Sequence, residues 1–253
     1  MHKVSVFVMT FNNIDKIKDC LESVTWADEI VVMDSFSTDG TVELCRQYTD
    51  KIVQEKFIGF GALRNKAVAA CANDWILSID SDERCTDELT HEVRALLAGD
   101  PSCDAYHVPR KTYFLDTWVR HCGWYPDYRQ PQFFNRRKMR YKEQLVHEGY
   151  ELDGRLGYLK GHAIQYPFLN LEQFLQKMDR YSSLRAAEMF KDGKKFSVIN
   201  ILVNPPAMFF RMYIAKRGFL DGTVGLLLSL LYGYYYTMIK YVKLWEKNRR
   251  PAA

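Results

Sequence analysis

The sequence lacks the cysteine spacings that mark a zinc site or a disulfide framework. It contains no C-x-x-C pair, and no cysteine is spaced with a histidine as zinc ligands are. The amino terminus also lacks the basic, apolar and small-residue pattern of a secretory signal. We therefore expect no zinc site, and free thiols in a reducing cytosol. The six cysteines are Cys20, Cys45, Cys71, Cys85, Cys103 and Cys122.

An even coating of positive charge is also missing, so we expect no nucleic-acid partner. The net charge is +4, but residues 205–253 hold eight Lys and Arg against two Asp and Glu. That segment is therefore +6, and residues 1–204 are −2. A basic tail rich in Tyr, Leu and Phe favours contact with an anionic membrane surface.

An apolar stretch near the carboxyl terminus, residues 222–239, falls short of a typical membrane span. It has eighteen uncharged residues, four of them tyrosines, whereas a span needs about twenty predominantly apolar residues. Tyrosine concentrates at membrane interfaces, and Lys240 and Lys243 follow directly. These features favour helices that lie on a membrane surface. The alternative is a helical hairpin that packs on the rest of the protein or in a homodimer.

Apolar runs of strand length alternate with helical patterns along the first hundred residues. The predicted strands cover residues 3–9, 30–33, 51–54 and 75–79. Between them, apolar residues recur at helical spacing, for example at Ile14, Ile17 and Leu21. This alternation predicts right-handed crossovers and an α/β fold with a parallel sheet. Helices are also predicted over residues 86–99 and from Asn170 onward.

Two acids follow the strand at residues 75–79. Asp80 and Asp82 are separated by one residue, so both carboxylates can turn toward one point at the sheet edge. Oxygen ligands at this spacing suit Mg²⁺ or Mn²⁺, which fill their other positions with water and substrate phosphates. The alternative is a solvated acidic turn.

Polar residues also follow the first two predicted strands. In parallel α/β sheets ligands bind outside the carboxyl ends of the strands, so a binding crevice is expected there. Arg64 follows two glycines, Gly59 and Gly61, and its fork of donors suits phosphate oxygens, although a surface arginine on a helix is the alternative. The residues at the strand ends are Thr10, Asn12, Asp34, Ser35 and Ser37.

These motifs resemble those of family 2 glycosyltransferases, which have the nucleotide-diphospho-sugar-binding fold called GT-A. The resemblance is carried in order by SVFVMTFNN, VVMDSFSTDGT, GALRNKA and SIDSDE. Further on, CGWYPDYRQPQFFNRRKMRY, QLVHEGY and RGFLDGTVGL resemble the subgroup that adds sugars to the inner core of bacterial lipopolysaccharide, the type that glucosylates core heptose.

The resemblance implies a Rossmann-like mixed sheet flanked by helices over residues 1–168. Its nucleotide-sugar half would cover about residues 1–100 and its acceptor half residues 101–168. Residues 169–253 would form a helical extension that associates with the membrane. The protein would act in the cytoplasm, peripherally attached to the cytoplasmic face of the bacterial inner membrane. Its partners would be a nucleotide sugar and a lipid-linked saccharide acceptor.

The resemblance also implies roles for residues of the donor site. Thr10, Asn12 and Asp34 would line the nucleotide pocket, and Arg64 would meet the diphosphate. Asp80 and Asp82 would hold the divalent metal and the ribose. Many relatives carry two consecutive acids where this chain has Asp34 and Ser35. A uridine donor, UDP-glucose, is the first expectation, and ADP-heptose is the alternative.

An inverting transfer needs a base that takes the proton of the attacking hydroxyl. Glu148 in the VHE motif is predicted to be this base, with Asp127 as the alternative. His147 or His162 could add a ligand to the metal or the phosphates, although a structural histidine is the alternative for each.

On the acceptor side, aromatic residues in the loop 113–128 suit sugar rings, and nearby arginines suit a phosphorylated acceptor. The predicted acceptor residues are Trp124, Tyr125, Arg129 and Arg136, with Arg137 beside them. Two other functional classes stay open. A sugar nucleotidyltransferase would share the sheet and metal site, but MTFNN lacks the usual glycine-rich, basic first turn. A non-catalytic sugar- or lipid-binding module would not need Asp80, Asp82 and Arg64 together.

Overall fold

The computed structural model describes residues 2–143 and 149–249, which form two compact units. The first unit consists of the chain up to Arg110 together with Asp127–Gln165. The second consists of Lys111–Pro126 and the chain from Tyr166 onward. The segment 111–126, predicted in the acceptor half, belongs to the second unit because Val119 and Cys122 are buried among its helices.

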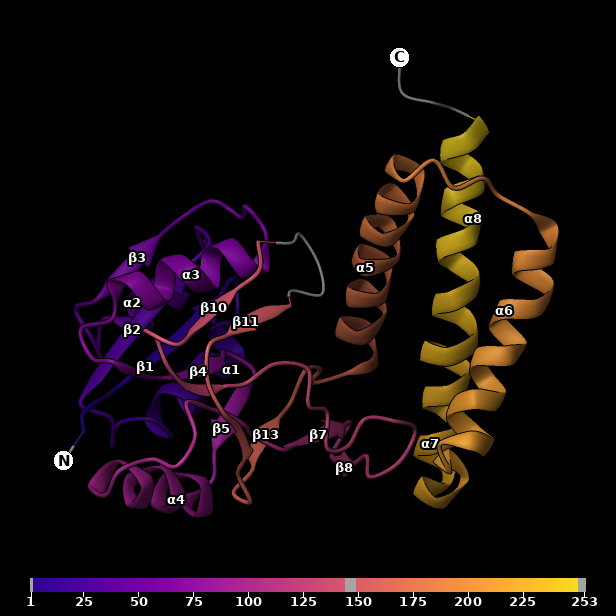
Figure 1. The fold of residues 1–253 in the computed structure, drawn as a ribbon. Coiled ribbons are helices and arrows are strands. Elements are labelled where there is room, and N and C mark those ends of the chain that lie inside the picture. The colour runs from indigo at the N-terminus through magenta and orange to yellow at the C-terminus, as the bar shows by residue number, and fades with distance from the viewer. Residues whose placement is uncertain (1, 144–148, 250–253) are drawn as a thin grey trace. The chain divides into compact units, whose positions relative to one another are not determined.

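A seven-stranded mixed sheet forms the centre of the first unit (Figure 1). Its strands, in spatial order, are β12 (Leu156–Tyr158), β6 (Ala105–His107), β9 (Phe133–Asn135), β4 (Trp75–Asp80), β1 (Val4–Thr10), β2 (Glu29–Asp34) and β3 (Ile52–Gln54). The four strands β1 to β4 are mutually parallel, whereas β9 runs antiparallel to both β4 and β6. This arrangement confirms the predicted α/β architecture.

Helices cover both faces of this sheet. The alternation of side chains along β1 sends Val4, Val6 and Val8 to one face and Phe7 to the other. The first face packs against α1, α2 and α4, and the second against α3. The helices are α1 (Ile14–Glu22), α2 (Thr41–Cys45), α3 (Phe60–Ala70) and α4 (Asp87–Ala98).

Local sequence signals fix the ends of two helices. The Thr86 side chain accepts a hydrogen bond from the Leu89 N–H at 3.3 Å and so caps α4, the helix predicted over residues 86–99. Asn170 caps α5 (Leu171–Lys191) in the same way, through the Gln173 N–H at 2.9 Å.

Short strands complete the first unit and begin the second. β5 (Glu83–Cys85) pairs antiparallel with β13 (Ala163–Gln165), and β10 (Met139–Tyr141) with β11 (Tyr150–Leu152). β7 (Arg110–Phe114) pairs antiparallel with β8 (Thr117–Trp118).

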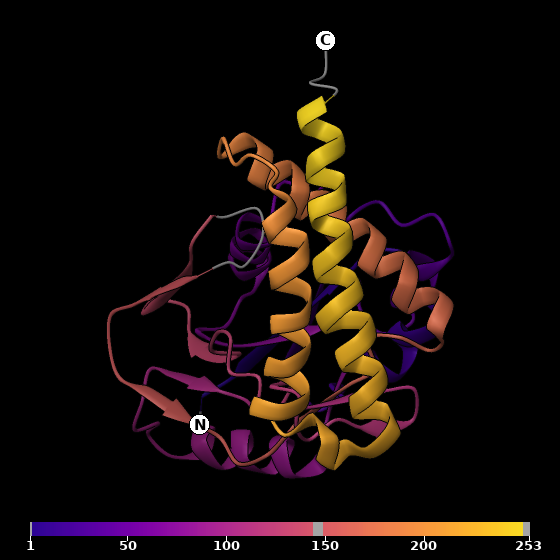
Figure 2. The ribbon, with the colours of Figure 1, turned by 90° about the vertical axis from the view of Figure 1, so that its right-hand side faces the viewer.

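The second unit is helical. After α5 come α6 (Val198–Phe210), η1 (Arg211–Ala215), η2 (Gly218–Asp221), α7 (Gly222–Leu228), η3 (Ser229–Tyr235) and α8 (Tyr236–Arg249). α8 contacts both α5 and α6, and it runs beside α6 (Figures 1 and 2).

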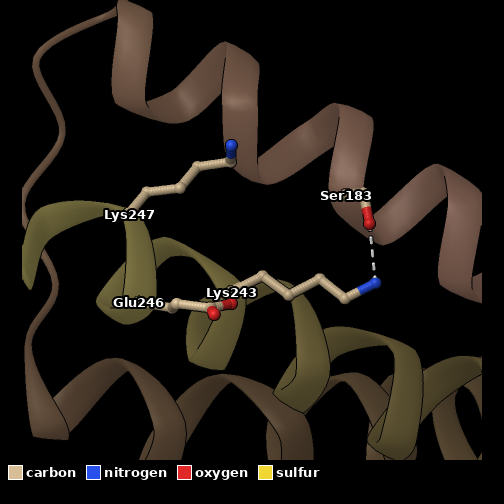
Figure 3. Close-up of a pocket in the computed structure, with 4 residues that line it drawn as sticks. All are labelled: Ser183, Lys243, Glu246 and Lys247. Carbon is tan, nitrogen blue, oxygen red and sulfur yellow. Dashed lines mark hydrogen bonds between the residues drawn. The ribbon is translucent and has the colours of Figure 1, made fainter. Parts of the chain in front are cut away.

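A surface hollow between α5 and α8 is lined by Ser183, Lys243, Glu246 and Lys247 (Figure 3). The Lys243 ammonium donates to Ser183 Oγ at 2.7 Å and to Ser182 Oγ at 2.9 Å. It also pairs with the Asp179 carboxylate at 2.5 Å. Lys243 therefore links α8 to α5. We interpret the hollow as part of the packing between these two helices and not as a ligand site.

Two apolar segments of the helical region bear on the predicted membrane contact. α6 begins at Val198 and continues through Pro205 and Pro206, each of which removes a backbone N–H donor from the helix. The stretch 222–239 is helical, as expected, and comprises α7, η3 and the start of α8. Its small residues face inward: a Cβ on Gly225 would lie 1.8 Å from the Gly218 carbonyl oxygen.

Candidate active site

The carboxyl ends of β1, β2 and β4 meet at one edge of the sheet. In the strand register, Thr10 lies opposite Asp34 and Met9 lies opposite Asp80. The Ser35 N–H donates to the Thr10 carbonyl and the Ser81 N–H donates to the Met9 carbonyl, both at 3.1 Å. The strand order changes direction beside β1, since the chain adds β2 and β3 on one side and β4 on the other. Such switch points are where open α/β sheets bind ligands.

Asp34 supports the turn that follows β2. It is fully buried, and its carboxylate accepts hydrogen bonds from the Ser37 N–H at 3.0 Å, the Ser37 hydroxyl at 2.5 Å and Gln54 Nε2 at 3.0 Å. Asn12 holds the same turn from β1, because its N–H donates to Ser37 Oγ and its Oδ1 accepts from the Thr38 N–H, both at 2.8 Å. These residues shape the rim of the edge.

Thr10 ends β1 with a buried hydroxyl. The side chain is buried, and among the described residues its Oγ1 has no hydrogen-bond partner. Buried hydroxyls in proteins are normally paired, so an unpaired one at a ligand-binding edge fits a contact to a bound molecule.

Arg64 is buried against the end of β4 and is not a surface residue. Its guanidinium donates to Ser78 Oγ at 2.6 Å and to Asp80 Oδ1 at 2.8 Å, and it lies 5.7 Å from the centre of the Tyr141 ring. Gly61 allows this burial because a Cβ there would lie 2.0 Å from the Lys142 carbonyl oxygen. Gly61 therefore lets α3 pack closely against the backbone that follows β10. Arg64 fixes the orientation of Asp80.

Asp80 and Asp82 are the two carboxylates that the sequence predicts as ligands of a divalent cation. The Asp80 side chain is 33% exposed, and Asp82 Oδ1 accepts from Gln165 Nε2 at 3.3 Å. Within residues 2–143 and 149–249, no group of three or more His, Cys, Asp or Glu is placed to hold a metal. Two carboxylates with phosphate and water nevertheless fit the ligand set that Mg²⁺ takes in nucleotide sites.

Glu83, which sequence reasoning left without a role, links this turn to a buried ionic network. Its side chain is fully buried, and its Oε2 accepts from the Asp80 N–H at 3.0 Å and from Gln132 Nε2 at 3.1 Å. Its Oε1 forms an ion pair with Arg110 Nε at 2.6 Å. Its place directly after the acidic turn in SIDSDE is the signal that could have found it.

Arg110 extends the network to Asp127. Arg110 Nη1 lies 3.0 Å from Asp127 Oδ2, and Arg129 Nε lies 2.8 Å from Asp127 Oδ1. Both Asp127 oxygens therefore accept from guanidinium groups. To act as the base, Asp127 would have to give up one of these ion pairs.

Glu83 should make the stability of the protein depend on pH. Burial raises the pKa of its carboxyl from 4.5 to about 7, with Asp80 and Asp82 adding to the rise and Arg110 opposing it. A raised folded-state pKa means that the protonated form is favoured, so this contribution to stability is present below pH 4.5 and is lost as the pH rises through about 7.

We expect the free energy of unfolding of the wild type to fall relative to that of Glu83→Gln between about pH 5 and pH 8. Urea titrations of both proteins across this pH range measure the difference between their free energies of unfolding. The contributions of the other titrating groups are common to both proteins and cancel in this difference. If the free energy of unfolding of the wild type instead rose relative to that of Glu83→Gln as the pH increased, the ion pair with Arg110 would outweigh the cost of burying the Glu83 carboxylate.

Several other predicted residues lie away from this edge. Arg136 donates to the Cys71 carbonyl, and Arg137 pairs with Asp74 at 2.9 Å, both at the amino end of β4. His162 lies beside Thr86, whose hydroxyl donates to its carbonyl at 2.9 Å. Gln165 on β13 contacts Asp82 at this edge.

The remaining predicted residues lie in the second unit or outside the residues that the structure describes. Trp124 packs edge-on against Tyr232 with ring centres 5.8 Å apart, and Tyr125 packs against Trp118 at 5.5 Å. Both aromatic pairs belong to the second unit. Glu148 and His147, the predicted base and one predicted metal ligand, lie outside the described residues.

Comparisons with known proteins agree with this geometry. The family described as Glycosyl transferase family 2 matches residues 5–152. The lipopolysaccharide core biosynthesis glycosyltransferase LpsC of Rhizobium meliloti (strain 1021) is 27% identical over 98% of this chain and 94% of its own. An uncharacterized glycosyltransferase of Rickettsia felis is also 27% identical, over 92% of this chain and 87% of its own.

Among solved structures, S. aureus TarS 1–349 in complex with UDP-GlcNAc superposes with a TM-score of 0.50. The sequence identity is 15%, over 98% of this chain and 92% of TarS 1–349, so the likeness concerns the fold. The family match covers more than half of the chain, including the edge built by Thr10, Asp34 and Asp80. The chain belongs to glycosyl transferase family 2.

Proposed function

We propose that the protein transfers a hexose from a nucleoside diphosphate sugar to a lipid-linked saccharide, with inversion at the anomeric carbon. The proposed donor is UDP-glucose, and the proposed acceptor is the inner core of lipopolysaccharide at the cytoplasmic face of the inner membrane. The observation that carries the proposal is the pairing of the buried Arg64 guanidinium with Asp80, beside Asp82 at the carboxyl edge of the sheet. Two relatives support it: LpsC is named for lipopolysaccharide core biosynthesis, and TarS was solved with UDP-GlcNAc.

In the proposed donor site, Asp80 and Asp82 would hold a Mg²⁺ or Mn²⁺ ion, which would supply positive charge to neutralise the departing diphosphate. Arg64 keeps Asp80 oriented through the 2.8 Å ion pair, and Glu83 holds the backbone of the same turn through the Asp80 N–H. Groups fixed before the reaction stabilise developing charge better than groups that must reorganise. The Thr10 hydroxyl and the Asn12 turn would border the nucleotide.

The transfer forms a bond from the acceptor oxygen to the anomeric carbon and breaks the bond from that carbon to the diphosphate oxygen. The acceptor hydroxyl loses its proton to a base on the face opposite the leaving group. Glu148 is proposed as this base. Asp127 is the second choice because both its oxygens are engaged by arginines. Arg129, with a side chain 67% exposed, can reach an anionic acceptor.

Thermal unfolding against a ligand panel tests the proposed function. Purified protein is heated with UDP, UDP-glucose, ADP and ADP-heptose, each with Mn²⁺ and with chelator. A ligand at a hundredfold its Kd should raise the midpoint by about 5–10 °C. We expect a uridine compound to do so only with metal.

The outcomes of the panel distinguish the alternatives. A preference for ADP-heptose would change the donor and keep the reaction. Binding of a nucleotide sugar with equal strength in chelator would argue against the metal site. If no nucleotide compound raises the midpoint, the proposed transfer is wrong, and a non-catalytic module becomes the better description.

A further inference from the structure

The α6–η1 segment exposes an apolar face to solvent. Ile199 and Leu202 are 67% and 66% exposed, and Val203, Phe210 and Ile214 are more than half exposed. On a helix of 3.6 residues per turn, Ile199, Val203 and Phe210 lie on one side. The opposite side is covered, since Pro205 and Met212 are buried within the second unit. Large apolar side chains gathered on one face mark an interaction surface.

The exposed charges of residues 193–221 are basic, because the one acid among them, Asp221, has a side chain only 4% exposed and pairs with His121. Residues 193–220 contain five basic residues and no Asp or Glu. All five basic residues are exposed, so their charge reaches the solvent beside the apolar side chains. They are Lys194, Lys195, Arg211, Lys216 and Arg217. An apolar helix face bordered by cations complements a lipid bilayer with anionic headgroups.

The geometry favours a helix lying on the membrane over a helix crossing it. Residues 198–215 are apolar and long enough to be a span by length and composition, with a mean hydropathy of 1.3. However, the segment contains Pro205 and Pro206, and the Asn204 side chain donates to the Tyr241 hydroxyl on α8 at 2.9 Å. α6 runs beside α8 (Figure 2), so it could cross a bilayer only by leaving α8 or by taking the lysines of α8 into the bilayer with it.

We propose that α6, η1 and η2, residues 198–221, form the docking face for a membrane that contains anionic phospholipids. This face replaces the stretch 222–239 expected from the sequence, which has no basic residue and buries Gly225, Ser229 and Thr237. The inference rests on the proposed function for the identity of the membrane-borne acceptor. Its readout, lipid binding without donor, is separate from transfer.

Vesicle co-sedimentation of the full chain tests the docking face. The protein is mixed with vesicles of phosphatidylethanolamine and phosphatidylglycerol, and with vesicles of phosphatidylcholine alone, without nucleotide. We expect binding to the anionic vesicles that weakens as salt rises. The variant Arg211→Gln/Lys216→Gln/Arg217→Gln should partition about 100-fold more weakly. Leu202→Glu should also lose binding, because it places a negative charge on the helix face that would enter the anionic lipid surface.

Leu184→Glu is the matched control, since Leu184 is a 40% exposed apolar residue on α5. It should bind vesicles like the wild type. All variants should keep the thermal midpoint of the wild type, which separates lost docking from misfolding. Binding that Leu202→Glu leaves intact would overturn the proposal.

Two other outcomes would also overturn the proposal. Conversion of a dimer to a monomer by Leu202→Glu, measured by light scattering, would make the face a contact between two copies. Resistance of the vesicle-bound protein to alkaline carbonate extraction would make residues 198–215 a span. A protein that binds anionic vesicles through this face but transfers no sugar would refute the proposed function alone.

Discussion

The variant Asp82→Asn is expected to transfer sugar at least about 10²–10³-fold more slowly than the wild type, the loss typical of removing one group that stabilises charge in the transition state. The substitution removes one of the two carboxylates proposed to hold the metal and keeps the size of the side chain. Initial rates of transfer to a lipopolysaccharide acceptor measure the effect. The thermal shift caused by UDP with Mn²⁺ should shrink in parallel, because Asp82 would help to hold the metal on which UDP binding is expected to depend.

Two comparison variants make this result specific. Asp87→Asn removes an exposed carboxylate of the first turn of α4, so it changes the net charge equally and should leave transfer unchanged. Glu148→Gln should abolish transfer but keep the UDP thermal shift, since a base acts on the acceptor. Normal turnover of Glu148→Gln with a loss in Asp127→Asn would move the base to Asp127. Normal turnover of Asp82→Asn would refute the metal site.

Replacing Arg110 with Met should lower the free energy of unfolding by about 3–5 kcal/mol, because removing one partner of a buried ion pair leaves an uncompensated charge. Water cannot replace the lost partner of Glu83, because the Glu83 side chain is fully buried. Asp127, the other partner of Arg110, is only 13% exposed. Urea unfolding at pH 7 measures the change. The variant should also weaken transfer, because Glu83 holds the backbone of the Asp80 turn.

Arg129→Met is the matched control for this prediction. Arg129 pairs with the same Asp127, but its side chain is 67% exposed, so its removal should cost about 0–1 kcal/mol. Equal costs for the two variants would contradict the view that the Glu83–Arg110 pair is a buried structural element. A larger cost for Arg110→Met at pH 8 than at pH 5 is expected, because the carboxyl with a raised pKa is then ionised.

Much of the nucleotide-binding half was determined by local sequence. The runs of β-branched residues that became β1 and β4 are recognisable because a strand buried on both faces must be apolar throughout. Thr86 and Asn170 mark helix starts because a capping side chain bonds within its own turn. Polar residues after parallel strands had to meet, since the carboxyl ends of such strands share one edge.

Tertiary structure alone decided what these residues contact. Whether Arg64 points to solvent or to Asp80 depends on the approach of the chain at Lys142, 78 positions beyond it. The Glu83–Arg110–Asp127 network joins three segments that no local pattern connects. Likewise, residues 198–215 and 222–239 are both apolar in sequence, and packing against neighbouring helices determines which face each one exposes. Helix propensity and hydropathy are properties of a segment, whereas burial is a property of its neighbours.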